Sequence, residues 1–274
     1  MSTAVELEPR QPRQLIVSLY GLYGRAGDGR LSVAALVRLM AGLGVDEPAV
    51  RSSISRLKRR GLLAADRRDG AAGYVLTPDA RQILADGDAR IFGRRRATAA
   101  DGWVLVVFSV PESEREKRHT LRTRLARLGF GTAAPGVWVA PGHLADEAVD
   151  VLERLGLDGY VQLFRGEAFG DVTARVRDWW DLDALRVRYA AFLAEYTPVR
   201  TRWARRRTAD PARAFADHVR LVTDWRQLPY ADPGLPLELL PPRWNGLRAE
   251  ELFADLAARL AAPAETHARE LIEG

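Results

Sequence analysis

The chain has 274 residues, of which 47% are hydrophobic and 28% charged, a balance typical of a globular protein with two or three domains. It contains no cysteine, which excludes disulfides and thiolate metal sites. No apolar run reaches the roughly 18 residues that span a bilayer, and the N-terminus lacks the pattern of a signal peptide. We therefore expect a cytoplasmic protein with no membrane partner, no metal and no cofactor.

The positive charge is concentrated in the N-terminal part of the chain. Residues 1–100 contain 17 Lys and Arg against 10 Asp and Glu, a net charge of +7. The remaining residues contain 24 against 26, a net charge of −2. Because neutralised phosphates supply most non-specific affinity for nucleic acid, this asymmetry favours a polyanionic partner for the first hundred residues.

Three helices are predicted before residue 64. Apolar residues recur at helical spacing from Pro12 to about Gly24, and again over residues 31–44, where Ser32 is the expected N-cap. The third helix covers residues 49–63, with Asp46 or Glu47 as its cap and Pro48 in its first turn.

The third helix has two distinct faces. Val50, Ile54 and Leu57 form its buried stripe. The rest of the helix presents small hydroxyls and long cations, with no acid between Ala49 and Gly61, as a helix in a DNA major groove requires. The candidate DNA-contacting residues on this helix are Arg51, Ser52, Ser55, Arg56, Lys58, Arg59 and Arg60.

A hairpin follows this helix directly. Residues 62–69 and 74–77 are predicted strands around a Gly-Ala-Ala-Gly turn, and Thr77 caps a closing helix. This order of elements predicts a winged helix-turn-helix DNA-binding domain over residues 1–96. Arg67 and Arg68 lie near the tip of the wing, where we expect them to reach the DNA backbone or minor groove.

The rest of the chain predicts two further domains, so the fold class is α+β. Between residues 97 and 170 the elements follow the order β-α-β-β-α-β of a ferredoxin-like domain, beginning with the apolar strand at Trp103. Residues 171–274 have helical periodicity and predict an α-helical C-terminal domain.

Four stretches of the sequence resemble the PaaX family of transcriptional regulators, repressors of phenylacetate degradation and their relatives. The most specific are the Gly129-Phe130-Gly131 and Pro135–Trp138 motifs and the tail 232–246. Residues 49–63, 103–141 and 179–193 also match the family's pattern.

The resemblance implies a homodimeric repressor of catabolic genes that binds a partly palindromic operator in double-stranded DNA. It implies a middle domain similar in fold to Cas2, and an effector such as an aromatic acyl-CoA, for example phenylacetyl-CoA. Cations and aromatic residues that suit such a ligand are Arg118, Arg122, Arg202, Arg205, Arg206, Arg207, Trp138, Trp179, Trp180 and Trp225. The alternative for each position is that the tryptophan belongs to the core and the arginine is solvated.

Two alternatives stay open at this point. A Cas2-like metal-dependent nuclease needs an acid at the end of the first strand of the middle domain, but Ser109 stands there and Glu112 follows a proline. The expectation is therefore that the chain is not an enzyme. The other alternative is a winged helix that binds a protein instead of DNA, against which the net charge of +7 argues.

Overall fold

The computed structural model describes residues 7, 9–25, 29–68, 70–93, 95–206, 208 and 210–274. Its contacts group the chain into two compact units that interleave along the sequence. Unit 1 consists of Met1–Phe92, Ala190–Arg226 and Gly246–Gly274, and unit 2 of Gly93–Tyr189 and Gln227–Asn245. The division into three consecutive domains drawn from the sequence stays a prediction.

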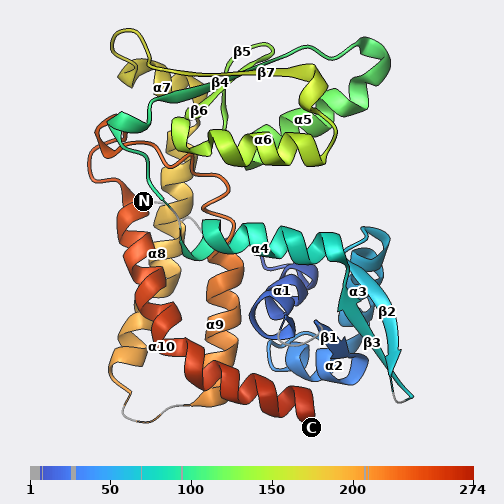
Figure 1. Ribbon diagram of the computed structural model, residues 1–274. Coiled ribbons are helices and arrows are strands. Elements are labelled where there is room, and N and C mark those ends of the chain that lie inside the picture. The colour runs from blue at the N-terminus through green and yellow to red at the C-terminus, as the bar shows by residue number, and fades with distance from the viewer. Residues whose placement is uncertain are drawn as a thin grey trace. The chain divides into compact units, whose positions relative to one another are not determined.

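The N-terminal part of unit 1 has the element order of a winged helix-turn-helix (Figure 1). The caps predicted for its helices are confirmed, because Ser32 Oγ accepts the Ala35 N–H at 3.0 Å and Thr77 Oγ1 accepts the Ala80 N–H at 3.2 Å. The elements are α1 (Pro12–Leu19), a π-helical turn (Tyr20–Gly24), β1 (Arg30–Ser32), α2 (Val33–Ala41), α3 (Glu47–Arg59), β2 (Leu63–Arg68), β3 (Ala71–Leu76) and α4 (Pro78–Phe92).

Strand β1 was not predicted from the sequence. It pairs antiparallel with β3, so the hairpin becomes a three-stranded sheet of order β1-β3-β2. Three residues are too few to show the alternation by which a strand is found in a sequence.

The C-terminal part of unit 1 consists of helices that pack on the N-terminal elements. They are the second half of α8 (Leu182–Ala204), α9 (Pro211–Trp225) and α10 (Asn245–Glu273). The Thr223 hydroxyl of α9 bonds to Ser18 of α1 at 2.7 Å, and both side chains are buried. Trp225 stacks on Phe253 of α10, with ring centroids 4.6 Å apart. Helix α10 is longer than predicted and contains Pro263.

Unit 2 contains the predicted ferredoxin-like order, and the α+β class is confirmed. Its strands are β4 (Trp103–Phe108), β5 (Gly131–Ala134), β6 (Val137–Pro141) and β7 (Val161–Gly166). They form one antiparallel sheet of order β5-β6-β4-β7. Helices α5 (Arg115–Arg127) and α6 (Ala145–Arg154) cover one face, where Leu121, Leu125 and Leu152 pack on Val104 and Val106 (Figure 1).

The helical stretch predicted after Asp171 is interrupted. Helix α7 (Thr173–Trp179) ends at Trp180, which is extended, and α8 begins two residues later. The indole N–H of Trp180 donates to the Gly129 carbonyl at 2.9 Å, and this buried bond connects the break to the segment between α5 and β5. None of the helices in the described ranges is both long and apolar enough to cross a membrane.

Candidate DNA-binding surface

Helix α3 is anchored at both ends and along one side. Of the two caps that the sequence allowed, Asp46 is the one observed, and its carboxylate accepts the Ala49 N–H at 2.8 Å. Gly61 has a φ of +70°, a conformation that favours glycine, and it ends the helix. The predicted stripe is buried, since Val50, Ile54 and Leu57 are 0%, 3% and 2% exposed.

The burial of this stripe turns the opposite face of α3 to solvent. Figure 1 shows α3 beside the β2–β3 hairpin, so the helix and the wing belong to one continuous surface. All nine residues predicted to contact DNA are exposed: Arg51, Ser52, Ser55, Arg56, Lys58, Arg59 and Arg60 on or just after α3, and Arg67 and Arg68 on β2.

Four of the cations on this surface have no partner among the residues that the structure describes. Within the described ranges, the guanidinium groups of Arg56, Arg59, Arg60 and Arg67 make no ion pair or hydrogen bond. Their donors can therefore bond to phosphates or base edges without breaking a contact inside the protein.

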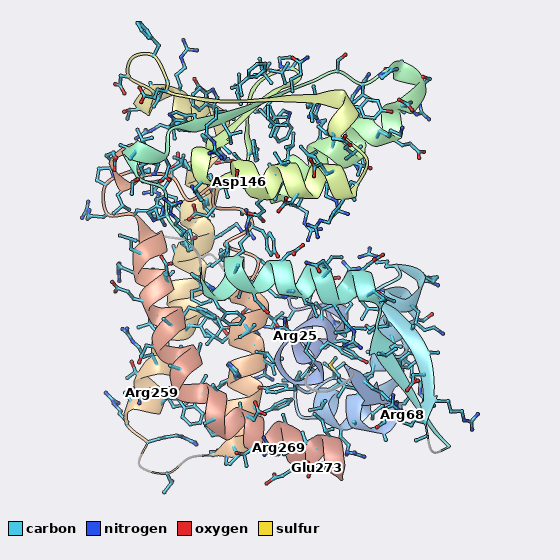
Figure 2. The ribbon with its side chains drawn as sticks, in the orientation of Figure 1. Arg25, Arg68, Asp146, Arg259, Arg269 and Glu273 are labelled. Carbon is cyan, nitrogen blue, oxygen red and sulfur yellow. The ribbon has the colours of Figure 1, made fainter. Side chains whose placement is uncertain are left out.

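Three other cations on the surface are already engaged. Arg51 donates to Glu47 one turn earlier at 2.7 Å, so DNA would compete with this carboxylate. Arg68, shown on the hairpin in Figure 2, lies 4.0 Å from the Asp66 carboxylate. The Lys58 ammonium lies 5.7 Å from the centre of the Tyr74 ring.

The wing is held in place by Arg30, a residue that the sequence reasoning missed. Arg30 is the first residue of β1, and its side chain passes over Gly73 of β3. Its guanidinium donates to the Asp66 carboxylate of β2 at 2.6 Å and to the Ala71 carbonyl at 2.8 Å. The absence of a side chain at Gly73 makes this possible, because a Cβ there would lie 2.9 Å from the guanidinium. The short length of β1 hid this role in the sequence.

The residues considered for an effector are divided between the two units. Trp138, Trp180 and Trp225 are buried in the cores of their units, at 6%, 9% and 1% exposure, and Trp179 packs on Trp103 at 5.7 Å. Arg118 bonds to Glu112, Arg122 and Arg205 are not buried, and Arg206 bonds to Asp210. Arg202 lines a cavity, and Arg207 lies outside the described residues.

Ser109 and Glu112, the residues at the position where a Cas2-like nuclease needs an acid, make hydrogen bonds within unit 2. The Ser109 N–H donates to the Tyr160 carbonyl at 3.1 Å, and the Glu112 carboxylate accepts from Arg118 at 3.0 Å. In the described part of the chain, no group of three or more His, Asp or Glu could hold a metal ion.

A curated protein and a solved structure resemble this chain over nearly its whole length. This chain is 29% identical over 270 residues to the transcriptional repressor PaaX of Escherichia coli (strain K12), and the alignment covers 94% of this chain and 83% of that protein. An uncharacterized protein from Mycobacterium tuberculosis has a similar fold, with a TM-score of 0.57, 22% identity, and coverage of 93% of this chain and 97% of that one.

Three family models match consecutive parts of the chain. The model of the PaaX-like protein matches residues 11–80, that of the PaaX protein central Cas2-like domain residues 96–176, and that of the PaaX-like protein C-terminal domain residues 180–270. Together they account for most of the sequence and agree with the relative. The chain belongs to the PaaX family.

Proposed function

We propose that this protein is a DNA-binding transcriptional repressor that uses α3 and the β2–β3 hairpin to bind its operator. The observation that carries the proposal is an exposed set of guanidinium groups, those of Arg56, Arg59, Arg60 and Arg67, that have no partner in the described part of the chain. The similarity to a transcriptional repressor supports the same function and supports the expectation that the chain is not an enzyme. A role on chromosomal DNA places it in the cytoplasm.

Helix α3 enters the major groove in this proposal. Arg51, Ser52, Ser55, Arg56 and Arg59 contact bases or phosphates, whereas Arg60, Arg67 and Arg68 hold the backbone. Lys58 and Arg51 contribute less than the unpaired arginines, because each already has a partner in the protein.

The finer parts of the proposal are a homodimer, a partly palindromic operator and a small-molecule effector. Two copies of the winged helix would contact half-sites about one helical turn, or a multiple of it, apart. An effector such as an aromatic acyl-CoA would release the DNA by favouring a dimer geometry that no longer matches this spacing. Such coupling requires roughly 1–3 kcal/mol of differential affinity.

Fluorescence anisotropy tests the proposal directly. The purified protein is titrated into labelled DNA from upstream of its own gene and into a random duplex, at two salt concentrations, with and without phenylacetyl-CoA. We expect preference for the upstream DNA and release by the thioester. Preference without release would keep the repressor and discard this effector. No preference over random DNA would contradict the proposal and favour a winged helix that binds a protein.

A further inference from the structure

A cavity of about 300 Å³ lies within unit 1, between the C-terminal half of α8, helix α9 and Arg10. Its volume is at the lower end of the range for small-molecule sites. Four arginines line it, Arg10, Arg202, Arg213 and Arg220, against two acids, Glu195 and Asp217. The formal charge of the lining is therefore +2, which is an attractive environment for an anion.

Two of the four arginines donate to a carboxylate, and among the described residues the other two do not. Arg10 donates to the buried Asp224 at 2.7 Å, and Arg202 donates to Asp217 at 2.7 Å. Within the described ranges, the Arg213 guanidinium makes no hydrogen bond, and that of Arg220 bonds only to a backbone carbonyl. Arg10 also lies 3.3 Å from Glu195, so with Asp224 counted the charge around the cavity is +1. This positive charge resides on the Arg213 and Arg220 guanidinium groups, whose donors are largely unused.

The guanidinium groups of Arg213 and Arg220 favour a phosphate as the ligand. A guanidinium presents donors in a planar fork that matches the oxygens of a phosphate, and two such forks around one cavity match a group with several oxygens and more than one charge. A phosphate carries between one and two negative charges near neutral pH, which is opposite in sign to the net charge around the cavity.

Arg220 also bonds to the segment that positions α3. Its Nη2 donates to the Leu43 carbonyl at 3.1 Å, and Leu43 lies in the turn between α2 and α3. Leu43 is itself 6% exposed, so the turn is packed where this bond reaches it. A phosphate in the cavity would compete with the Leu43 carbonyl for Arg220.

We propose that this cavity binds the phosphate group of a small-molecule ligand, through Arg213 and Arg220, and that the bound ligand acts on the α2–α3 turn through Arg220. The binding site stands on the cavity and its charges alone. Its effect on DNA affinity rests on the proposed function.

Binding is measured by isothermal titration calorimetry of the full chain with inorganic pyrophosphate at physiological ionic strength, without DNA. We expect one saturable site, and at least a tenfold weaker affinity in the Arg213→Gln/Arg220→Gln double variant. The matched control is Arg200→Gln, which removes an exposed guanidinium of α8 that does not line the cavity. No saturable binding, or equal loss in the control, would overturn the site.

Coenzyme A in the same titration separates two sources of phosphate. Competition of coenzyme A with pyrophosphate assigns the cavity to the phosphates of a larger ligand, whereas pyrophosphate binding alone assigns it to small free anions. Hydrogen exchange at the amides of residues 43–47 tests the coupling, with faster exchange expected when pyrophosphate is bound. Unchanged exchange at a saturated site would overturn the coupling. Because no arm contains DNA, a failed repressor proposal would leave these results unaffected.

Discussion

Arg51 and Arg56 are both exposed on α3, yet the structure gives them different capacities to bind DNA. Arg51 shares its guanidinium with Glu47, whereas Arg56 has no partner in the described ranges. Helical periodicity predicted the exposed face from the sequence. It did not predict which of these cations form an ion pair, because Glu47, the acid that binds Arg51, lies in the first turn of α3, before the residues that carry the cations.

Replacing Arg56 by alanine should weaken binding to the operator by about 1–3 kcal/mol if its guanidinium contacts a base. The binding to random duplex should change much less, because a base contact carries the sequence preference. Anisotropy titration of both duplexes measures this. Arg248→Ala is the matched control, since Arg248 is an exposed arginine of α10 in the same unit. Equal weakening on both duplexes would make Arg56 a phosphate contact instead.

His218 is predicted to make the stability of the protein depend on pH. Burial lowers the pKa of this histidine to about 4, although the negative charge of Glu265 acts to raise it. The Nδ1 atom of His218 lies 3.0 Å from the Tyr23 hydroxyl. As the pH falls below about 6.5, the unfolded chain binds a proton that the folded chain does not, so stability decreases. This effect amounts to about 2 kcal/mol between pH 7.5 and pH 5.

Urea denaturation of wild type and His218→Asn at these two pH values measures the contribution of His218. The asparagine variant should start less stable at pH 7.5, because it loses packing and the contact with Tyr23. It should then lose about 2 kcal/mol less than wild type on acidification. Parallel losses in both proteins would show that other groups titrate.

At the scale of elements, the predictions that depend on residues close in sequence are confirmed, and those that depend on distant contacts were missed. Side-chain caps at Ser32, Asp46 and Thr77 begin three helices where the sequence placed them. Strand β1 was missed, because its pairing with β3 is set by tertiary contact and not by its own three residues. The break at Trp180 was missed for a similar reason, since its partner, the Gly129 carbonyl, is 51 residues away.

The wing should loosen when Arg30 is replaced by glutamine. The side chain connects β1 to Asp66 on β2 and to the Ala71 carbonyl, and hydrogen bonds between charged groups contribute about 1.5–3 kcal/mol. Hydrogen exchange of the β2 and β3 amides should therefore become faster. Asp66→Asn should have a similar effect, and the double variant little more than either, because both break the same contact. Additive effects would show that Arg30 and Asp66 act separately.

At the scale of the whole molecule, contacts between distant segments define the two units. Asp224 of α9 accepts bonds from Arg10 and from the Tyr196 hydroxyl, which attaches the start of the chain to the C-terminal helices. In unit 2, Asp232 accepts from the Tyr189 hydroxyl at 2.7 Å and so holds the tail. Periodicity predicted each of these helices, but it carries no information on which buried carboxylate meets which partner.

The motifs by which the sequence resembles the PaaX family contact one another within unit 2. A Cβ at Gly129 would lie 3.2 Å from Pro233 of the tail, and a Cβ at Gly131 would lie 2.6 Å from the Trp179 carbonyl and 2.7 Å from the Trp180 ring. These glycines therefore permit the close approach of segments that are far apart in the sequence. The motifs were visible in the sequence, whereas their contact with one another was not.

Gly131→Ala should for this reason destabilise unit 2, by about 1–3 kcal/mol, as is usual when atoms are added to a packed interior. Urea denaturation followed by tryptophan fluorescence measures the loss, since Trp180 packs against the altered position. Gly159→Ala is the control, because a Cβ at that glycine meets nothing within 4 Å. If both variants unfold at the same urea concentration as wild type, the close packing of Gly131 against Trp180 does not limit stability, and the glycine in this motif has some other role.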